Sequence, residues 1–283
     1  LSHQHTADSA ASVTAFYQSL LTAIPTAEPT DPTPLALLAT LRRTASQVER
    51  DLTAFPHEQL KAHQLLASAF HRINTPDDAR YHQSRAIAWA RKLNAPLLET
   101  TQLELALASW MAEGINAPKA LATIAHLQNT LPADARTPEL NFALHSVEAK
   151  AALADGQFAQ AKTVLDRMAV NAEKHTPPIV GQIEIHQLFA KLHQQLEQPK
   201  EAIARHKTVM ELLALRNPRD PLLEEQTAIR LAENLSQIGE TEEAVSRSRE
   251  IWQRQQKRLP ENDPRLLITQ AVVGRLMTAE EQQ

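Results

Sequence analysis

Three histidines recur at one distance from an alanine, and their type and spacing could support chemistry. His63, His145 and His186 each precede an alanine by four residues. Histidine titrates near neutral pH, and its neutral ring binds metal ions, so a repeated position could form a pH sensor or a metal site. We favour the simpler interpretation that each ring fills a seam between two helices. A pH- or metal-dependent switch or enzyme built on these rings remains the alternative.

Two lysines also occupy equivalent positions. Lys150 and Lys191 are 41 residues apart, and each directly follows an alanine. Steps of three back, one forward and four forward from such an alanine stay on one side of a helix. This side, which we call the first-helix face, is polar and comprises Gln64, Ser68, His71, Ser109, Ser146, Lys150, Gln187, Lys191, Gln194, Glu233 and Ser236. We expect the lysines to bind a carboxylate of a peptide, a C-terminus or a small anionic ligand, the alternative being a merely solvated face.

Motifs for catalysis are missing from the sequence. It contains no P-loop, HExxH helix, nucleophile elbow or kinase signature. Without cysteine, thiol chemistry and Cys-based metal sites are excluded. We therefore predict that this chain is not an enzyme, has no catalytic or metal-binding residue and needs no cofactor.

The alanines themselves predict the elements that position these side chains. Ten of them form pairs twelve residues apart, and the pairs recur at intervals of 41, 41, 41 and 42 residues. They are Ala67 and Ala79, Ala108 and Ala120, Ala149 and Ala161, Ala190 and Ala202, and Ala232 and Ala244. A small side chain permits the closest approach of two helices. Each pair therefore predicts two antiparallel helices that touch at the alanines, and stacked pairs make a solenoid.

Helix breakers support this division. Gly, Pro and Asn separate the members of each pair and close each repeat. Low Gly and aromatic content, with 5 glycines and 4% aromatic residues, also argues against a sheet. We predict an all-α, right-handed α-solenoid of five helix pairs over residues 60–262, a capping helix and polar tail over 263–283, and two N-terminal helices with a Pro/Thr linker over 1–59. Gly274 should be the small seam residue of the final helix.

Charge and hydropathy limit the partners. The net charge of −4 shows no basic footprint, so we expect no nucleic-acid partner. No 18-residue apolar window exists, so no transmembrane segment is predicted in this sequence. The chain begins at Leu1 without a signal-peptide pattern, and we interpret it as a fragment or a processed chain.

The helix-pair pattern resembles the tetratricopeptide repeat. The stretch "AKAALADGQFAQAKTVLDRM" (149–168) carries the likeness most closely. The longer period, together with "KRLPENDPRLL" (257–267) as a linker, is similar to the kinesin-light-chain variety. The resemblance implies that first helices line a concave groove, in which we expect a protein, a peptide or a small anionic ligand to bind.

A narrower likeness concerns the N-terminal part. "FYQSLLTAI", then "LALLATLRRTASQVERDL", then "HEQLKAHQLLASAFHRINTPDDARYHQSRAIAWAR" is similar to the region after the membrane anchor in some bacterial receptor-type Ser/Thr protein kinases. This resemblance implies a periplasmic sensor region, tethered to the inner membrane through its N-terminus and used in signal transduction. The alternative is a cytoplasmic array, either the effector domain of a transcription activator or an assembly scaffold. The sequence identifies neither the ligand nor the oligomeric state.

Overall fold

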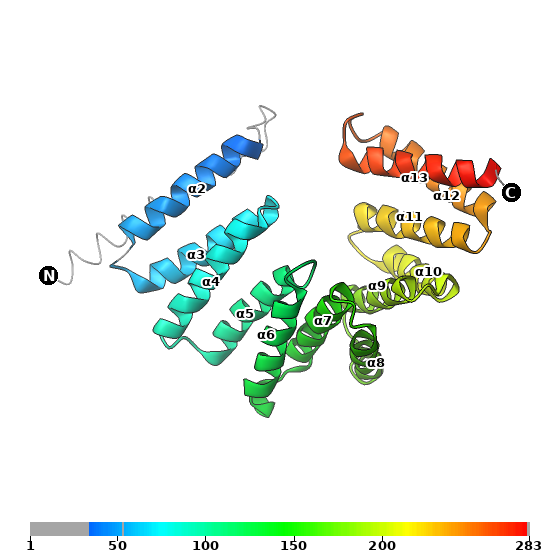
Figure 1. Ribbon diagram of the computed structural model, residues 1–283. Helices are drawn as coiled ribbons and strands as arrows, with labels where there is room; N and C mark the ends of the chain where they lie inside the picture. The colour runs from blue at the N-terminus through cyan, green and yellow to red at the C-terminus, as the bar shows by residue number, and fades with distance from the viewer. Residues whose placement is uncertain (1–33, 53, 282–283) are drawn as a thin grey trace. The chain divides into compact units, whose positions relative to one another are not determined.

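The computed structural model describes residues 34–52 and 54–281, and this part of the chain is helical throughout (Figure 1). Besides one short 3-10 turn, Ala133–Ala135, it contains twelve α-helices and no strand. The helices are α2 Pro34–Asp51, α3 Pro56–Arg72, α4 Pro76–Lys92, α5 Leu97–Met111, α6 Ala117–Thr130, α7 Pro138–Ala154, α8 Phe158–Lys174, α9 Ile179–Gln195, α10 Pro199–Leu215, α11 Pro221–Gln237, α12 Thr241–Gln256 and α13 Pro264–Glu281. Of the predicted N-terminal region 1–59, residues 1–33, which hold the first predicted helix and most of the Pro/Thr linker, lie outside the described residues.

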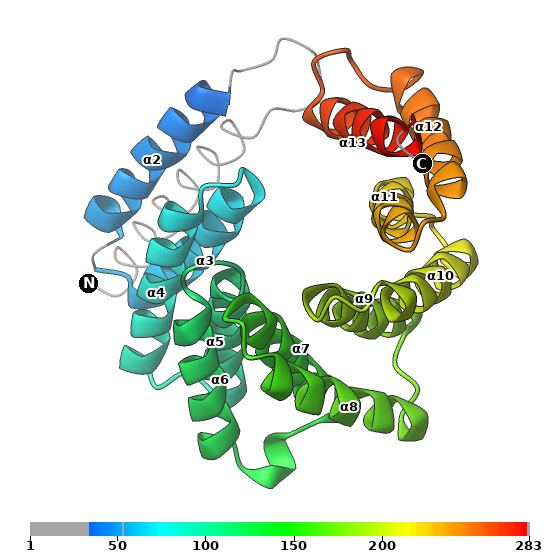
Figure 2. The same cartoon turned by 45° about the vertical axis from the view of Figure 1, so that its right-hand side comes forward.

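The described residues divide into two compact units. Unit 1 comprises 34–111 and 122–135, and unit 2 comprises 112–121 and 136–281. In unit 1, α3 packs on α4, and α2 and α5 join this pair. In unit 2, helices α7 to α13 pack each on the next along the chain (Figure 2). Both units are therefore built from consecutive antiparallel helix pairs.

Proline begins most helices, and its position explains why the predicted breaks coincide with the observed ends. Proline lacks an N–H and has a fixed φ, which suit the first turn of a helix and interrupt a preceding one. Helix-initiating prolines are Pro34, Pro56, Pro76, Pro138, Pro199, Pro221 and Pro264. Two of these helices also have a side-chain cap, since Thr137 accepts a hydrogen bond from the N–H of Leu140 and Asp220 accepts one from that of Leu223.

The turn between the two helices of a pair repeats one backbone conformation. Its left-handed residue is Asn74 (φ 57°), Gly156 (φ 74°) or Gly239 (φ 87°) in three of the pairs. Glycine and asparagine tolerate this region best. Glu197 holds the same place at φ 55°, which is unfavourable for an ordinary L-residue. The shared turn fixes how each second helix returns along the first.

The ten alanines lie at the helix contacts, as the repeat predicts. Every one of them has 0% of its surface exposed. Each first alanine is the twelfth residue of its helix, as Ala149 is in α7, and each second alanine is the fourth, as Ala161 is in α8. The contact therefore lies near the turn that joins the two helices. A larger side chain there would force the helices apart.

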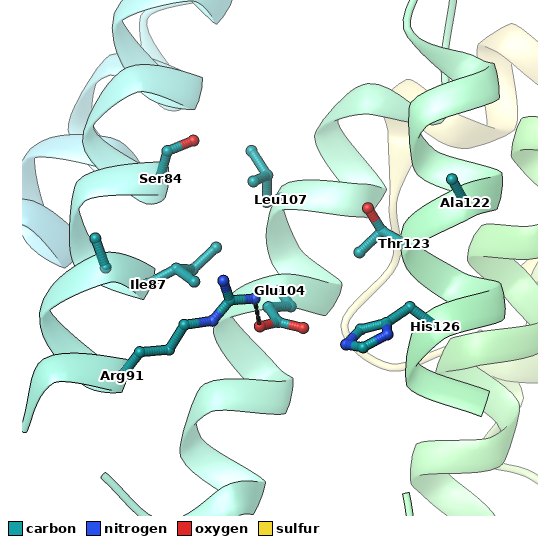
Figure 3. A pocket seen from close by; sticks show the side chains of 9 residues that line it. Ser84, Ile87, Arg91, Glu104, Leu107, Ala122, Thr123 and His126 are labelled. Atoms are coloured by element: carbon teal, nitrogen blue, oxygen red, sulfur yellow. Dashed lines mark hydrogen bonds and ion pairs between the residues drawn. The ribbon is translucent and has the colours of Figure 1, made fainter. Parts of the chain in front are cut away.

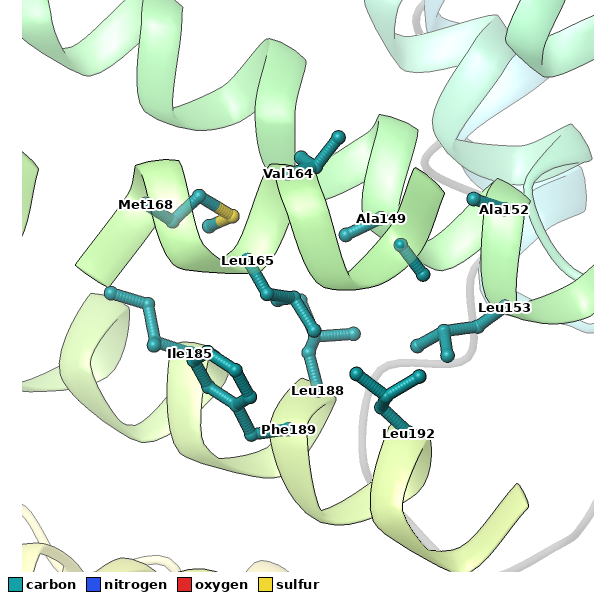
Figure 4. Packing of buried hydrophobic residues seen from close by; sticks show 11 residues of the cluster. Ala149, Ala152, Leu153, Val164, Leu165, Met168, Ile185, Leu188, Phe189 and Leu192 are labelled. Carbon is teal, nitrogen blue, oxygen red and sulfur yellow. The ribbon is translucent and has the colours of Figure 1, made fainter. Parts of the chain in front are cut away.

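Leucine-rich faces complete the core around these alanines. In unit 2, α7, α8 and α9 bring Leu153, Leu165 and Leu188 together beside Ala149 (Figure 4). Leu165 is 0% exposed and Leu188 is 5% exposed. Burying apolar surface of this kind stabilises the fold by roughly 25 cal/mol per Å².

The helix α2 packs on α3 and closes the described end of unit 1. Leu41 and Val48 of α2, and Leu52 just after it, are 1–2% exposed and form one cluster with Leu66 and Phe70 of α3. A polar bond adds to this docking, because the side-chain amide of Gln59 donates to the carbonyl of Val48 at 3.2 Å. The part of the N-terminal region that is described is thus attached to the repeats rather than separate from them.

At the other end, α13 packs on α12 and α11. The predicted capping helix is therefore present, but Gly274 is not a seam residue. It is exposed, and a Cβ added there would meet nothing within 4 Å. Within the described residues no further helix follows α13 that could approach Gly274, which explains why the repeat distance does not place it in a seam.

The predicted fold class is confirmed: the chain is an all-α array of stacked helix pairs of the α-solenoid type. Ten helices, α3 to α12, occupy the region for which five pairs were predicted, with α2 and α13 beside them. The predicted division at residues 59/60 and 262/263 remains a prediction, and the two compact units divide the described residues differently.

Candidate functional site

An internal ion pair occupies part of the first-helix face of unit 2. The ammonium group of Lys150 on α7 pairs with Glu184 on α9, and the hydroxyl of Ser146 donates to the same carboxylate oxygen of Glu184 at 2.6 Å. Ser146 is buried, and both Lys150 and Glu184 are about one-quarter exposed, with side-chain values of 29% and 26%. The charge of Lys150 is therefore already neutralised by the protein itself.

Lys191 differs from Lys150 although it holds the same position in the next repeat. Its side chain is exposed, and within the described part of the chain it has no hydrogen bond or ion pair. The register explains this difference. Glu184 lies six residues before Ala190, and the residue six before Ala232 is Gln226, an uncharged side chain. Lys191 thus keeps its positive charge available to a ligand.

The other predicted residues of unit 2 surround these lysines without forming one cluster. Gln187 is half-buried, and Gln194 Nε2 lies 3.4 Å from Nε2 of His206. Glu233 pairs with Arg230 at 3.2 Å and with Arg275 of α13 at 3.0 Å. Ser236 is half-buried near the end of α11. The acid at 233 is therefore satisfied within the protein, whereas Gln187 and Lys191 of α9 remain open to a ligand.

In unit 1 the first-helix face has a different character. His71 of α3 stacks on Trp110 of α5, with ring centroids 4.6 Å apart and planes 17° apart. Ser68 is exposed, while Gln64 and Ser109 are half-buried. None of these four predicted residues carries a fixed charge. An anionic group is therefore better accommodated by the face of unit 2.

One of the three seam histidines forms a buried pair that the sequence did not reveal. Nδ1 of His63 on α3 lies 2.8 Å from Nδ1 of His82 on α4, and the rings are 0% and 4% exposed. Burial lowers the pKa of each ring to about 4, because the charged form loses its hydration. Phe70 stacks on His82 at 5.3 Å, with ring planes 3° apart.

The two remaining seam histidines are only half-buried. Burial lowers the pKa of His145, and burial followed by the charge of Arg205 lowers that of His186. Nη1 of Arg205 lies 3.3 Å from Nδ1 of His186. His63 and His186 therefore each contact the second helix of their pair, in agreement with the simpler interpretation, and His145 is half-buried. A further ring, His206, is 6% exposed, and burial lowers its pKa to about 4.

A pocket of about 460 Å³ lies among α4, α5 and α6 in unit 1 (Figure 3). Ile87 and Leu107 form apolar walls, and Arg91, Glu104 and His126 point toward one another at one end. Arg91 Nη2 is 2.5 Å from Glu104 Oε1, and the Glu104 side chain is only 9% exposed. The buried carboxylate is thus neutralised by Arg91. Sequence reasoning did not identify this pocket, because its residues come from three helices, α4, α5 and α6, and none of them belongs to the repeated polar positions of the first-helix face.

The described residues also bear on metal ions and membranes. Among the described residues, no group of three or more His, Cys, Asp or Glu is placed to hold a metal ion. None of the described helices has both the length and the apolar character needed to cross a bilayer.

Comparison with known proteins supports the fold. The chain is similar to the crystal structure of PilW, which is described as a widely conserved type IV pilus biogenesis factor. The likeness has a TM-score of 0.54 at 13% sequence identity and covers 81% of this chain and 90% of PilW. No protein-family model matches the chain, and no curated protein matches it. At this identity the similarity establishes a tetratricopeptide-like helical-repeat fold and nothing finer.

Glu184 is the residue of this surface that sequence reasoning missed. Its signal was present, because it lies 34 residues after Lys150, which is one repeat less two helical turns. Two first helices that pack side by side bring such positions together. The next repeat is 42 residues long, so the position that corresponds to Glu184 for Lys191 is Gln226, whereas a fixed step of 34 residues would have led to Glu225.

Proposed function

We propose that this chain is a non-catalytic repeat domain that binds a protein or peptide through the first-helix face of unit 2, with Lys191 contacting a carboxylate. The observation that carries this proposal is the exposed, unpaired ammonium group of Lys191 between the amides of Gln187 and Gln194. A lysine can donate three hydrogen bonds to a carboxylate, and the amide of Gln187 can bind the peptide backbone.

Lys150 has a different role in this proposal. Its charge holds α7 against α9 through Glu184, so a ligand carboxylate would have to displace an existing carboxylate. Such an exchange gains little free energy, because one ion pair replaces another. Lys150 therefore supports the surface on which Lys191 acts, and only Lys191 is free to contribute binding energy.

The experiment uses an array of short acidic peptides with free C-terminal carboxylates and the same peptides with amidated ends. Wild-type protein is compared with Lys191→Gln and, as a matched control one repeat away, Lys150→Gln. Because a hydrogen bond to a charged group contributes about 1.5–3 kcal/mol, Lys191→Gln should weaken binding roughly tenfold or more. Lys150→Gln should weaken it by less than about threefold. Equal losses in both variants would reject Lys191 as the anchor.

We further propose that the domain is the periplasmic sensor region of a membrane-anchored bacterial Ser/Thr kinase. The N-terminal resemblance supports this proposal, and within unit 1 the described part of the N-terminal region, α2, is docked on the repeats. A ligand that prefers one arrangement of the helix pairs would shift the equilibrium toward it. Determining the protein sequence that precedes Leu1 tests the proposal, because a transmembrane helix after a kinase domain is expected there.

The alternative is an assembly scaffold, or the effector domain of a cytoplasmic transcription activator. The scaffold is favoured by one observation, the fold similarity to a protein that is described as a pilus biogenesis factor. The same upstream sequence distinguishes the candidates. A DNA-binding domain before Leu1 would support the activator and contradict the kinase. A tether without a kinase domain would support the scaffold.

A further inference from the structure

The buried imidazole pair, His63 and His82, has a proton arrangement that its surroundings determine. A 2.8 Å contact between two ring nitrogens requires one proton between them, so one Nδ1 donates and the other accepts. Nε2 of His63 is buried and has no hydrogen-bond partner. A bare Nε2 on His63 avoids burying an unsatisfied N–H. His63 therefore carries its proton on Nδ1 and donates it to His82.

Addition of one more proton disturbs this arrangement whichever ring receives it. If His63 becomes the cation, its Nε2 gains a proton that has no acceptor. If His82 becomes the cation, its Nδ1 must donate, and His63 must then shift its own proton to the same buried Nε2. Every cationic form that keeps the contact therefore places an unsatisfied N–H inside the protein. The pair is stable only when it is neutral.

Charged groups around the pair do not remove this penalty. From α2, Glu49 attracts a proton, and from α4, Asp78 attracts one while Arg85 repels it. Both carboxylates already have partners, because the hydroxyl of Tyr81 donates to Glu49 at 2.7 Å and Arg42 pairs with Asp78 at 2.8 Å. Burial outweighs their attraction, so the pKa of each ring stays near 4.

The pair lies under the contact that holds α2. Phe70 stacks on His82 and also belongs to the cluster that buries Leu41 and Val48 of α2. The two polar links from α2 to α4, Tyr81–Glu49 and Arg42–Asp78, begin at residues near His82 in the helix. Separation of the two imidazoles would move Phe70 and α4 and would withdraw both kinds of support from α2.

We propose that the His63–His82 pair is an acid-sensitive latch, which holds α2 on unit 1 at neutral pH and releases it when the pH falls toward 4. Once α2 has moved away, water reaches the rings and each can carry a proton freely. Acid therefore favours the released state, since exposed rings bind protons more tightly than the buried pair does. The latch is independent of ligand binding to the first-helix face of unit 2, because every residue of the latch belongs to unit 1.

The absence of cysteine from the sequence permits a direct test. Cysteines placed at the exposed positions Gln47 on α2 and Ala88 on α4 carry a donor and an acceptor fluorophore. Energy transfer is recorded from pH 7.5 to pH 4, together with far-UV circular dichroism. Transfer should fall on acidification while most of the helical signal remains. Simultaneous loss of both signals would mean general unfolding and would overturn the latch.

Two variants assign the effect to the pair. His82→Gln retains an oxygen that accepts from His63 but cannot take up a proton, so α2 release should shift to lower pH by at least about one unit. His206→Gln, a buried ring in unit 2, should leave the release curve unchanged. If His82→Gln does not fold, the NMR resonances of the His63 and His82 rings in the wild-type protein show at which pH the rings become protonated. Protonation of the rings without a change in energy transfer would refute the proposal.

Discussion

The two units hold different chemistry at the same two positions of their repeats. In unit 1, His63 is followed 19 residues later by His82, and in unit 2, His186 is followed 19 residues later by Arg205. Both pairs join a first helix to its second helix, at 2.8 Å and 3.3 Å. The first pair is buried and neutral. The second is half-buried, and its arginine, which lies 4.5 Å from the centroid of Phe189, keeps its charge.

This difference shows that the repeat fixes where two side chains meet but not how the contact responds to pH. Burial excludes water from the unit 1 pair, so a second proton has no favourable place. In unit 2, a protonated His186 can turn toward solvent, and Arg205 retains its aromatic contact. Both contacts join equivalent positions of a first and a second helix, and the burial of each histidine ring decides how the contact responds to pH.

The largest expected effect tests how much each pair depends on the aromatic ring beside it. Phe70 is 0% exposed, and Phe70→Ala should destabilise unit 1 by about 3–5 kcal/mol through loss of burial and the cavity it leaves. Phe189 is 6% exposed beside a half-buried arginine, so Phe189→Ala should lie near the lower end, about 3 kcal/mol. Amide hydrogen exchange in α3 and α9 reports each unit separately. A greater loss from Phe189→Ala would contradict the view that unit 1 is the more tightly packed seam.

The second-largest effect should come from acid, which should act differently on the His63–His82 pair and on the His186–Arg205 pair. For His63 and His82 the folded-state pKa, about 4, lies below the ordinary value of 6.5. The unfolded chain therefore binds protons first, and stability falls as the pH drops from 6.5 toward 4. One such shift corresponds to about 3 kcal/mol at pH 4, to be measured as loss of amide protection in α3 and α4.

Unit 2 provides the control for this acid response once its own buried ring is removed. His206 also has a pKa of about 4, so the wild-type α10 should lose protection too. In His206→Gln, α9 and α10 should become much less sensitive to acid, while α3 and α4 behave as before. If unit 1 were equally insensitive in this background, the contrast between the buried and half-buried pairs would be wrong.

The helices and their seams could be predicted because they depend on local sequence. A proline or a left-handed Asn or Gly marks each break, and a 41-residue spacing can be read without a structure. Gly274 shows the limit of that reasoning: it has the right spacing, yet it is exposed because no described helix follows α13 to pack on it. A seam residue requires a neighbour, and spacing alone does not supply one.

The site could be predicted only in part for the same reason. Lys150 and Lys191 look identical when each is compared with its own alanine. Their difference arises from the next first helix, which offers Glu184 to the one and Gln226 at the corresponding position to the other. His63 likewise pairs with a residue of the second helix, His82, that no repeated histidine pattern marks. Contacts between helices decide which predicted groups remain free.

The smallest expected effect concerns the half-buried pair itself. Replacing His186 and Arg205 by Ala, singly and together, gives their coupling free energy in unit 2. At pH 7.5 the neutral ring accepts from Arg205, and we expect a coupling of about 0.5 kcal/mol, because water competes at a half-exposed site. Below the pKa of His186, which lies below its ordinary value, the ring carries a positive charge and the coupling should vanish or become repulsive. Because His186 is only half-buried, α9 in the His206→Gln background should lose less amide protection on acidification than α3 does. A coupling above about 2 kcal/mol, the magnitude of a buried charged hydrogen bond, would show that this pair is as well shielded as His63 and His82, and burial would then not explain the difference between the two units.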